Sequence, residues 1–181
     1  MNLVLLFAGL CLGALAACSR EPAPAPDAST PDTSSLRNVS PTEALDRFDQ
    51  RAPVPLLPMM AQHQKQNMRD HLVAVHEIVA AVGAEDFAAV EAAARRLGSS
   101  DSMQRTCTHM GAGAPGFAEQ ALAFHRTADR IALAALDQAP ARVLTELAAT
   151  LAACTSCHAA WKQQVVDEAT WQRLTGSAAP P

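Results

Sequence analysis

The sequence contains no tyrosine, and aromatic residues make up only 4% of its 181 residues. Hydrophobic residues still account for 49%, and alanine supplies much of that share. Alanine and leucine favour helices, whereas aromatic and β-branched residues favour strands, so this composition indicates an all-α protein. Basic residues are not in excess either, because the net charge is −4 and the pI about 5.8. A nucleic-acid partner is therefore not expected.

Long apolar runs are also scarce. The run from Leu3 to Ala17 is too short to span a membrane comfortably and is typical of a secretory signal peptide. No apolar run of spanning length is expected after residue 17. The run ends in Leu15-Ala16-Ala17-Cys18, which resembles a bacterial lipobox. The resemblance implies that residues 1–17 are removed and that the thiol of Cys18 is lipidated. The alternative is ordinary secretion with Cys18 incidental.

The rest of the chain divides by composition. Residues 18–54 are rich in proline, alanine, serine and threonine, which indicates a tether that cannot form a core of its own. Within the tether, the segment Pro41 to Arg51 could form a short helix. Residues 55–165 carry the helical patterns and form the expected domain. Residues 166–181 are expected to be a flexible tail.

Helical periodicity and the Gly and Pro positions predict the helices of the domain. The first helix is predicted to begin near residues 55–58 and to end at residue 82. The other predicted ranges are 85–97, 117–136 and a last helix from Pro140, and the first half of 99–116 is a further helical candidate. Along the first helix, apolar residues recur at helical spacing and predict one buried face: Met68, Leu72, Val75, Val79 and Val82. His71 and Ile78 are expected to widen this face.

The last helix contains the motif Cys154-Thr155-Ser156-Cys157-His158. C-x-x-C-H is the attachment signature of a c-type haem. Residues three and four apart share a helix face, so one turn can offer two thiols and an imidazole together. The alternatives are a redox C-x-x-C, which needs a βαβ context, and half of a zinc site, which needs a second ligand pair.

An apolar stripe leads along the last helix into this motif. Its members recur every three or four residues: Val143, Leu147, Leu151, Cys154, His158 and Trp161. Trp161 follows His158 by one turn and is expected to pack against the macrocycle or to close its edge.

The stretch Cys154–Lys162 matches the pattern C-x-x-C-H-x-x-aromatic-basic, near the C-terminal end of the last of four predicted helices. In these features the sequence resembles the class II cytochromes c, the cytochrome c′ family, over residues 55–165. The resemblance implies an antiparallel four-helix bundle with one covalently attached haem c. His158 would be the proximal iron ligand, and the first helix would line the distal face.

The resemblance also implies two possible functions. Some members leave the sixth position open and bind nitric oxide or carbon monoxide, whereas others place a methionine on the iron and transfer electrons. We expect single-electron transfer between periplasmic redox proteins rather than enzymatic catalysis. The alternatives are gas binding or scavenging and an accessory subunit that relays electrons to a larger enzyme. Dimerisation is common in the family.

Met68 is the predicted sixth ligand. It belongs to the predicted apolar face of the first helix and stands fifteen residues before Gly83. At ~1.5 Å per residue it lies roughly 22 Å from that turn, toward the end where the motif is expected. Members with methionine ligation carry it at a similar distance before the first interhelical loop. Met60 and His71 are the rival ligands.

The candidate histidines, rival included, are expected to be surface or satisfied-core residues: His63, His71, His109 and His125. The candidate methionines other than Met68 are expected to be packing or loop residues: Met59, Met60, Met103 and Met110. Cys107 has no partner left, which indicates a buried thiol or an intermolecular disulfide. Gln64 occupies a position where family members often have a basic residue near the haem propionates, and Lys65 and Arg69 are the nearest cations.

Overall fold

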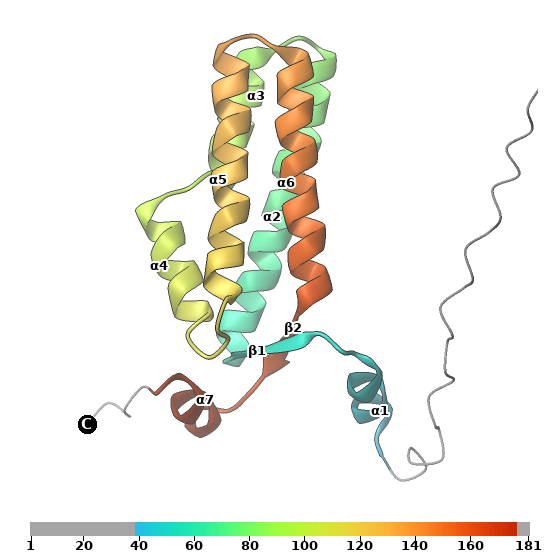
Figure 1. Cartoon of the computed structure of the whole chain (residues 1–181), viewed down its shortest axis with the longest axis vertical. Helices are drawn as coiled ribbons and strands as arrows, with labels where there is room; N and C mark the ends of the chain where they lie inside the picture. Colours follow the sequence, from blue (N-terminus) through green and yellow to red (C-terminus); the bar gives the residue numbers. More distant parts are fainter. Residues whose placement is uncertain (1–38, 177–181) are drawn as a thin grey trace, which may run out of the picture. The chain divides into compact units, whose positions relative to one another are not determined.

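The computed structural model describes residues 39–176 and is mostly helical (Figure 1). The chain divides into residues 1–48 and residues 49–181, and each unit is described by itself. In the first unit, helix α1 (Pro41–Phe48) begins with reciprocal bonds between Ser40 and Glu43. Such a capping box satisfies two backbone N–H groups that a helix start leaves free. The short helix predicted here is confirmed, and the predicted lipidation site Cys18 lies outside the described residues.

The second unit contains the other helices and a small sheet. Proline opens α2 and α6, and side chains of Asp86, Ser100 and Asp167 cap α3, α4 and α7. The predicted helix positions are confirmed to within a few residues at each end. The elements are β1 (Ala52–Leu56), α2 (Pro58–Gly83), α3 (Phe87–Leu97), α4 (Asp101–Met110), α5 (Phe117–Leu136), α6 (Pro140–Ala160), β2 (Trp161–Val165) and α7 (Glu168–Thr175).

Four helices, α2, α3, α5 and α6, run side by side around a common apolar core (Figure 1). Alanine supplies much of this core, which lets the helix backbones approach closely. Its larger fully buried side chains are Ile78, Val90, Leu97, Ile131 and Val143. A second apolar cluster, which includes Val54, Leu56 and Phe117, lies at the end of the helices that adjoins the sheet.

The predicted buried face of α2 is wrong in part. Leu72 is 68% exposed and Val79 is 53% exposed, whereas Ala74 and Ala81 are buried instead. Ile78, which was expected to widen the face, is buried as predicted. The apolar residues from 72 to 82 are nearly continuous, so two neighbouring stripes fit the helical period. Packing selects the stripe that contains Ala74 and Ala81, because alanine side chains permit a close approach to α3.

The stripe on α6 needs a similar correction at two positions, because Leu151 and His158 are both exposed. Leu151 is 40% exposed, and Thr150 is buried in its place. The Thr150 hydroxyl donates to the Glu146 carbonyl at 2.8 Å, so its burial leaves no polar group without a partner. The inward face therefore continues through Cys154 and Cys157, which are both half-buried.

A two-stranded parallel sheet adds to the predicted all-α fold. β1 pairs with β2 in a register that aligns Ala52 with Trp161 and Leu56 with Val165. Pro53 and Pro55 lie in β1, which is possible because each strand of a two-stranded sheet has one edge that needs no donor. The sheet joins the start of α2 to the end of α6.

The predicted boundaries of the domain are therefore too narrow. Residues 49–54, assigned above to the tether, belong with the helical unit. The expected tail contains α7, whose Trp171 is buried and packs against His109 with ring centroids 5.3 Å apart. The helical unit thus extends beyond residues 55–165 on both sides.

The expectation about apolar runs also needs a correction. Among residues 39–176, α6 is long and apolar enough to cross a membrane by length and composition. Core helices of folded proteins pass the same test. In this structure, α6 packs along α5 and buries Val143, Leu147 and Thr150.

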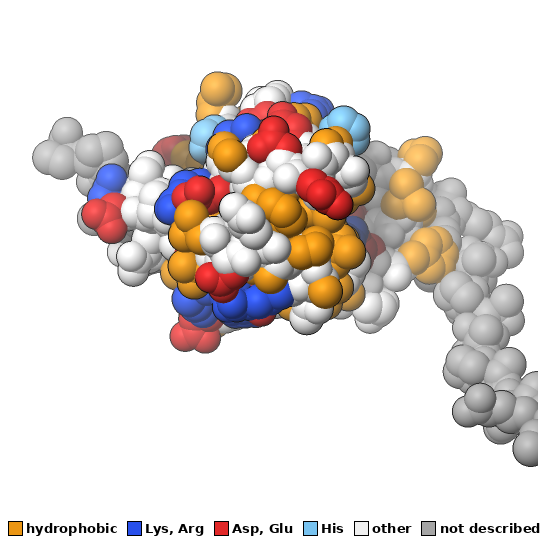
Figure 2. Space-filling view, turned by 90° about the horizontal axis from the view of Figure 1, so that it is seen from above, with side chains coloured by type: hydrophobic (Ala, Val, Ile, Leu, Met, Phe, Trp, Pro, Cys, Tyr) orange, Lys and Arg blue, Asp and Glu red, His pale blue; other side chains and the backbone are white. Residues whose placement is uncertain are grey.

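Hydrophobic side chains also gather at the end of the molecule where α5 turns into α6 (Figure 2). Leu133, Leu136 and Leu144 near this turn are exposed. The cysteine motif lies at the other end of α6, so this apolar surface is not part of the candidate site.

Candidate functional site

The last two turns of α6 bring the motif residues to one cavity. Cys154, Cys157 and His158 all line a space of about 480 Å³ between α2, α4, α5 and α6. The two thiols are half-buried, and His158 is exposed. The helical spacing predicted from the motif is thus present, and its three functional groups border the same cavity.

Most of the cavity wall is apolar or contains sulfur. Phe117, Ala121 and Phe124 contribute from α5, while Met103 and Met110 contribute from α4. These two methionines were expected to be packing or loop residues. Met110 packs in the second apolar cluster as expected, and both methionines also line the candidate site. A cavity of this size lies in the range of ligand and cofactor sites, which are mostly apolar with a few placed polar groups.

The thiols in this wall are free and protonated. Burial raises the pKa of Cys157, and burial together with the neighbouring Cys157 raises the pKa of Cys154. Cys107, which is buried and also lines the cavity, has a raised pKa for the same two reasons. The site therefore contains three neutral thiols at neutral pH, one more than the motif requires.

Arg51, which sequence reasoning missed, secures the backbone at His158. Its Nη1 donates to the His158 carbonyl at 3.1 Å, and its Nε and Nη2 donate to the Asp49 carboxylate at 2.9 and 2.8 Å. These bonds from Arg51 lower the pKa of Asp49. Lys162 Nζ donates to the Asp49 carbonyl at 3.0 Å. The β1–β2 pairing holds Arg51 at this point, and no local sequence pattern indicates it.

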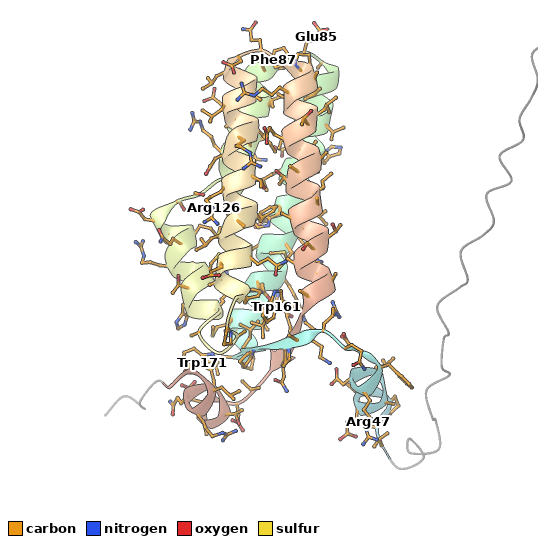
Figure 3. The ribbon with its side chains drawn as sticks, in the orientation of Figure 1. Arg47, Glu85, Phe87, Arg126, Trp161 and Trp171 are labelled. Carbon is orange, nitrogen blue, oxygen red and sulfur yellow. The ribbon has the colours of Figure 1, made fainter. Side chains whose placement is uncertain are left out.

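A second missed residue, Gln120 on α5, joins the motif to Trp161. The Trp161 indole donates to Gln120 Oε1 at 2.7 Å, and Gln120 Nε2 donates to Ser156 Oγ inside the motif at 3.1 Å. Trp161 lies between the last turn of α6 and the first turns of α5 (Figure 3) and meets Phe117 edge-on at 5.8 Å. Gln120 therefore fixes both the motif and the aromatic ring that follows it.

Met68, the predicted sixth ligand, also lines the cavity. It is 36% exposed, so it lies at the margin of the cavity and not in the apolar core. The rival His71 lines the same cavity one turn further along α2, whereas the other rival, Met60, packs in the second apolar cluster.

Two histidines form a close pair in the cavity wall. The rings of His71 and His125 are 5.5 Å apart and nearly perpendicular, and both contact Phe124. His125 is 3% exposed, and its Nδ1 lies 2.6 Å from the Leu97 carbonyl, an arrangement in which Nδ1–H donates. His125 was expected to be a surface or satisfied-core residue, and this bond makes it a satisfied core residue that also faces the cavity.

The environment keeps both imidazoles neutral at neutral pH. Burial and the neighbouring His125 lower the pKa of His71 to about 4, against a smaller opposing effect of Asp70. Burial lowers the pKa of His125, and its bond to Leu97 opposes that shift. A neutral imidazole retains the lone pair that metal ligation requires.

The remaining candidates lie outside the cavity. His63 is near the Asn67 side chain, and His109 packs on Trp171. Met59 is 77% exposed. Among the described residues, no group of three or more His, Cys, Asp or Glu side chains converges as a metal-ion site.

Comparison with known proteins gives no relative. No family model matches the chain, and neither curated proteins nor solved structures give a significant match.

The residues at the cavity fit the haem c that the motif implies. Two thiols and one imidazole border a largely apolar space, and the thiols are free to form bonds. Aromatic side chains line the wall, and cationic side chains occur among the lining residues as partners for carboxylates. The site can thus hold an apolar macrocycle by its edge and offer a nitrogen ligand to its metal.

The histidine pair predicts a pH dependence of stability. The pKa of His71 is about 4 in the folded chain and 6.5 for the free side chain, so the unfolded chain binds more protons between these values. We expect the free energy of unfolding of the haem-free polypeptide to decrease as the pH falls from about 6.5 to about 4.

Chemical denaturation across this pH range measures the effect. In His71→Phe, the free energy of unfolding should fall less over this pH range, and the fall that remains should be the part due to His125. The control His76→Phe removes an exposed imidazole from the same helix and should leave the decrease in place. An unchanged pH dependence in His71→Phe would contradict the assignment.

Proposed function

We propose that the protein is a monohaem c-type cytochrome, similar to the cytochrome c′ family, that transfers single electrons in the periplasm. The observation that carries the proposal is that Cys154, Cys157 and His158 line one cavity of about 480 Å³. The resemblance implies an antiparallel four-helix bundle, and its four helices would be α2, α3, α5 and α6.

The chain's own residues would hold the group in defined ways. The S–H bonds of Cys154 and Cys157 would add across the two vinyl groups, which leaves two thioether bonds and no by-product. His158 would provide the proximal nitrogen, and Met68 the sixth ligand. When bound, haem c supplies a one-electron ferric–ferrous couple.

The protein environment supports such a role. Phe117, Phe124 and Met110 are buried and make the inner wall of the cavity apolar. Burial of the porphyrin and identity of the axial ligands are the main influences of a protein on haem potential. Arg51 holds the backbone of His158, so the proximal ligand would be oriented from a rigid helix end.

Location is a further part of the proposal. The lipobox-like sequence before Cys18 supports a lipid anchor on the periplasmic side of a bacterial membrane. In that position the haem domain would meet periplasmic redox proteins while residues 18–48 connect it to the anchor.

Covalent attachment tests the proposal. The double variant Cys154→Ala/Cys157→Ala should contain no covalent haem after expression with a c-type maturation system, because each thiol supplies one bond. A haem stain of a denaturing gel measures the result. Cys107→Ala removes the third thiol of the same cavity and should retain covalent haem. Covalent haem in the double variant, or its loss in Cys107→Ala alone, would contradict the assignment.

A second candidate function is the binding of nitric oxide or carbon monoxide at an open sixth position. The marginal position of Met68, at 36% exposure, favours this candidate. Coordination at the sixth position distinguishes the two functions, because carbon monoxide must displace a bound methionine but enters an open site directly.

Met68→Ala is the corresponding test. If Met68 is the ligand, the ferric variant should lose the long-wavelength methionine–iron charge-transfer band, become high-spin and bind carbon monoxide faster when reduced. Met59→Ala is the matched control, because Met59 is exposed on the same helix and does not line the cavity. A wild-type spectrum without the band, or a band that survives Met68→Ala, would exclude Met68 as the ligand.

A further inference from the structure

The charged side chains at the cavity are all of one sign. Four cations line it, Arg51, Lys65, Arg69 and Lys162, and no Asp or Glu of the described chain does so. The complete sequence has the opposite bias, with 18 acidic and 14 basic residues. The cavity is therefore a positive region on an acidic protein.

Two of these cations have local partners. Arg51 is bound to the Asp49 carboxylate, and Lys162 donates to the Asp49 backbone carbonyl. Their charges are in part committed to fixing the end of α6. The free positive charge of the region therefore has to come from α2.

Lys65 and Arg69 lie one turn apart on α2, and both are exposed. Neither forms an ion pair within residues 39–176, and Arg69 Nη1 only reaches Gln66 Oε1 at 3.5 Å. The adjacent Asp70 accepts a bond from Gln66 and borders a separate hollow. Four other arginines on the helices do have carboxylate partners: Arg95, Arg96, Arg130 and Arg142.

We propose that Lys65 and Arg69 form a docking site for an acidic surface of a redox partner protein. This inference rests on the proposed function, because the site matters for electron transfer only if the adjacent cavity holds haem. Met68 lies between the two cations in sequence and lines the same cavity. A partner bound to Lys65 and Arg69 would therefore stand at the cavity through which the electron leaves.

The charge pattern gives this site a physical effect on association. A local positive potential attracts negative groups and raises their association rate by about 10- to 1,000-fold at low ionic strength. The net charge of −4 repels the same groups elsewhere on the surface. Lys65 and Arg69 would thus select both the partner's charge and its orientation.

Binding of a redox-inert anion tests the site directly. Hexacyanochromate(III) is a paramagnetic trianion that broadens the NMR signals of nearby residues. At low ionic strength it should broaden the amide signals of residues 65–69 in the haem-loaded protein, and added salt should reverse the effect. Broadening spread evenly over the surface, or confined to other residues, would contradict the proposal.

Charge reversal with a matched control sharpens this test. Lys65→Glu/Arg69→Glu should abolish the local broadening. Arg105→Glu/Arg126→Glu produces the same change in net charge at two exposed cations that do not line the cavity. Arg126 extends from α5 on the side of α4 (Figure 3). This control should retain the broadening of the signals of residues 65–69. Loss of that broadening in the control would show that only net charge matters and would overturn the proposal.

Electron transfer to small probes provides the second readout. Each reduced protein gives one electron to hexacyanoferrate(III), which becomes hexacyanoferrate(II), or to tris(bipyridine)cobalt(III), which becomes cobalt(II). The ratio of the two rates removes the effect of any change in midpoint potential common to both reactions. In Lys65→Glu/Arg69→Glu, the rate with the anionic probe divided by the rate with the cationic probe should fall tenfold or more at low salt.

The outcomes separate this inference from the proposed function. An unchanged rate ratio with a shifted midpoint potential would mean that Lys65 and Arg69 serve the haem propionates, and the docking proposal would be wrong. Covalent haem with no probe selectivity would overturn the docking proposal alone. A wild-type protein without covalent haem would overturn both.

Discussion

The end of α6 is the constraint on which the rest of the structure depends. Cys154, Cys157 and His158 lie in the last two turns of a helix, where backbone carbonyls lack intrahelical partners and helices tend to fray. Arg51 donates to the carbonyl of His158, and the strand that follows is paired with β1. Gln120 holds the motif from the other side through Ser156. A site that needs two thiols and an imidazole at fixed spacing is thereby held in one conformation.

The cavity in turn depends on a break between α3 and α4. Gly98 lies at the break, and a Cβ there would stand 2.3 Å from Asp129 Oδ1. The Asp129 carboxylate accepts from the Ser99 backbone N–H at 3.0 Å, and His125 contacts the Leu97 carbonyl at 2.6 Å. These α5 side chains satisfy the backbone groups that the break exposes. Because α4 is a separate helix, its face with Met103, Cys107 and Met110 can border the cavity.

The sequence predicts the features that are local. Helix ends follow from Pro58, Gly83 and Pro140, and the motif spacing places its thiols and imidazole on one helix surface. The buried face of α2 is not determined in this way, because its nearly continuous apolar residues are compatible with two faces. The β1–β2 pairing was missed because the segments are short, contain proline and show no alternation. Arg51 and Gln120 act through single contacts across the chain, and such contacts leave no periodic signal.

The central claim is that this cavity belongs to a covalently bound haem, and the mass of the protein tests it most directly. The wild-type chain should be expressed with a c-type maturation system and its intact mass determined after denaturation. The mass should exceed that of the processed polypeptide by one haem. A mass equal to that of the polypeptide alone, for correctly exported and folded protein, would contradict the presence of a covalent haem.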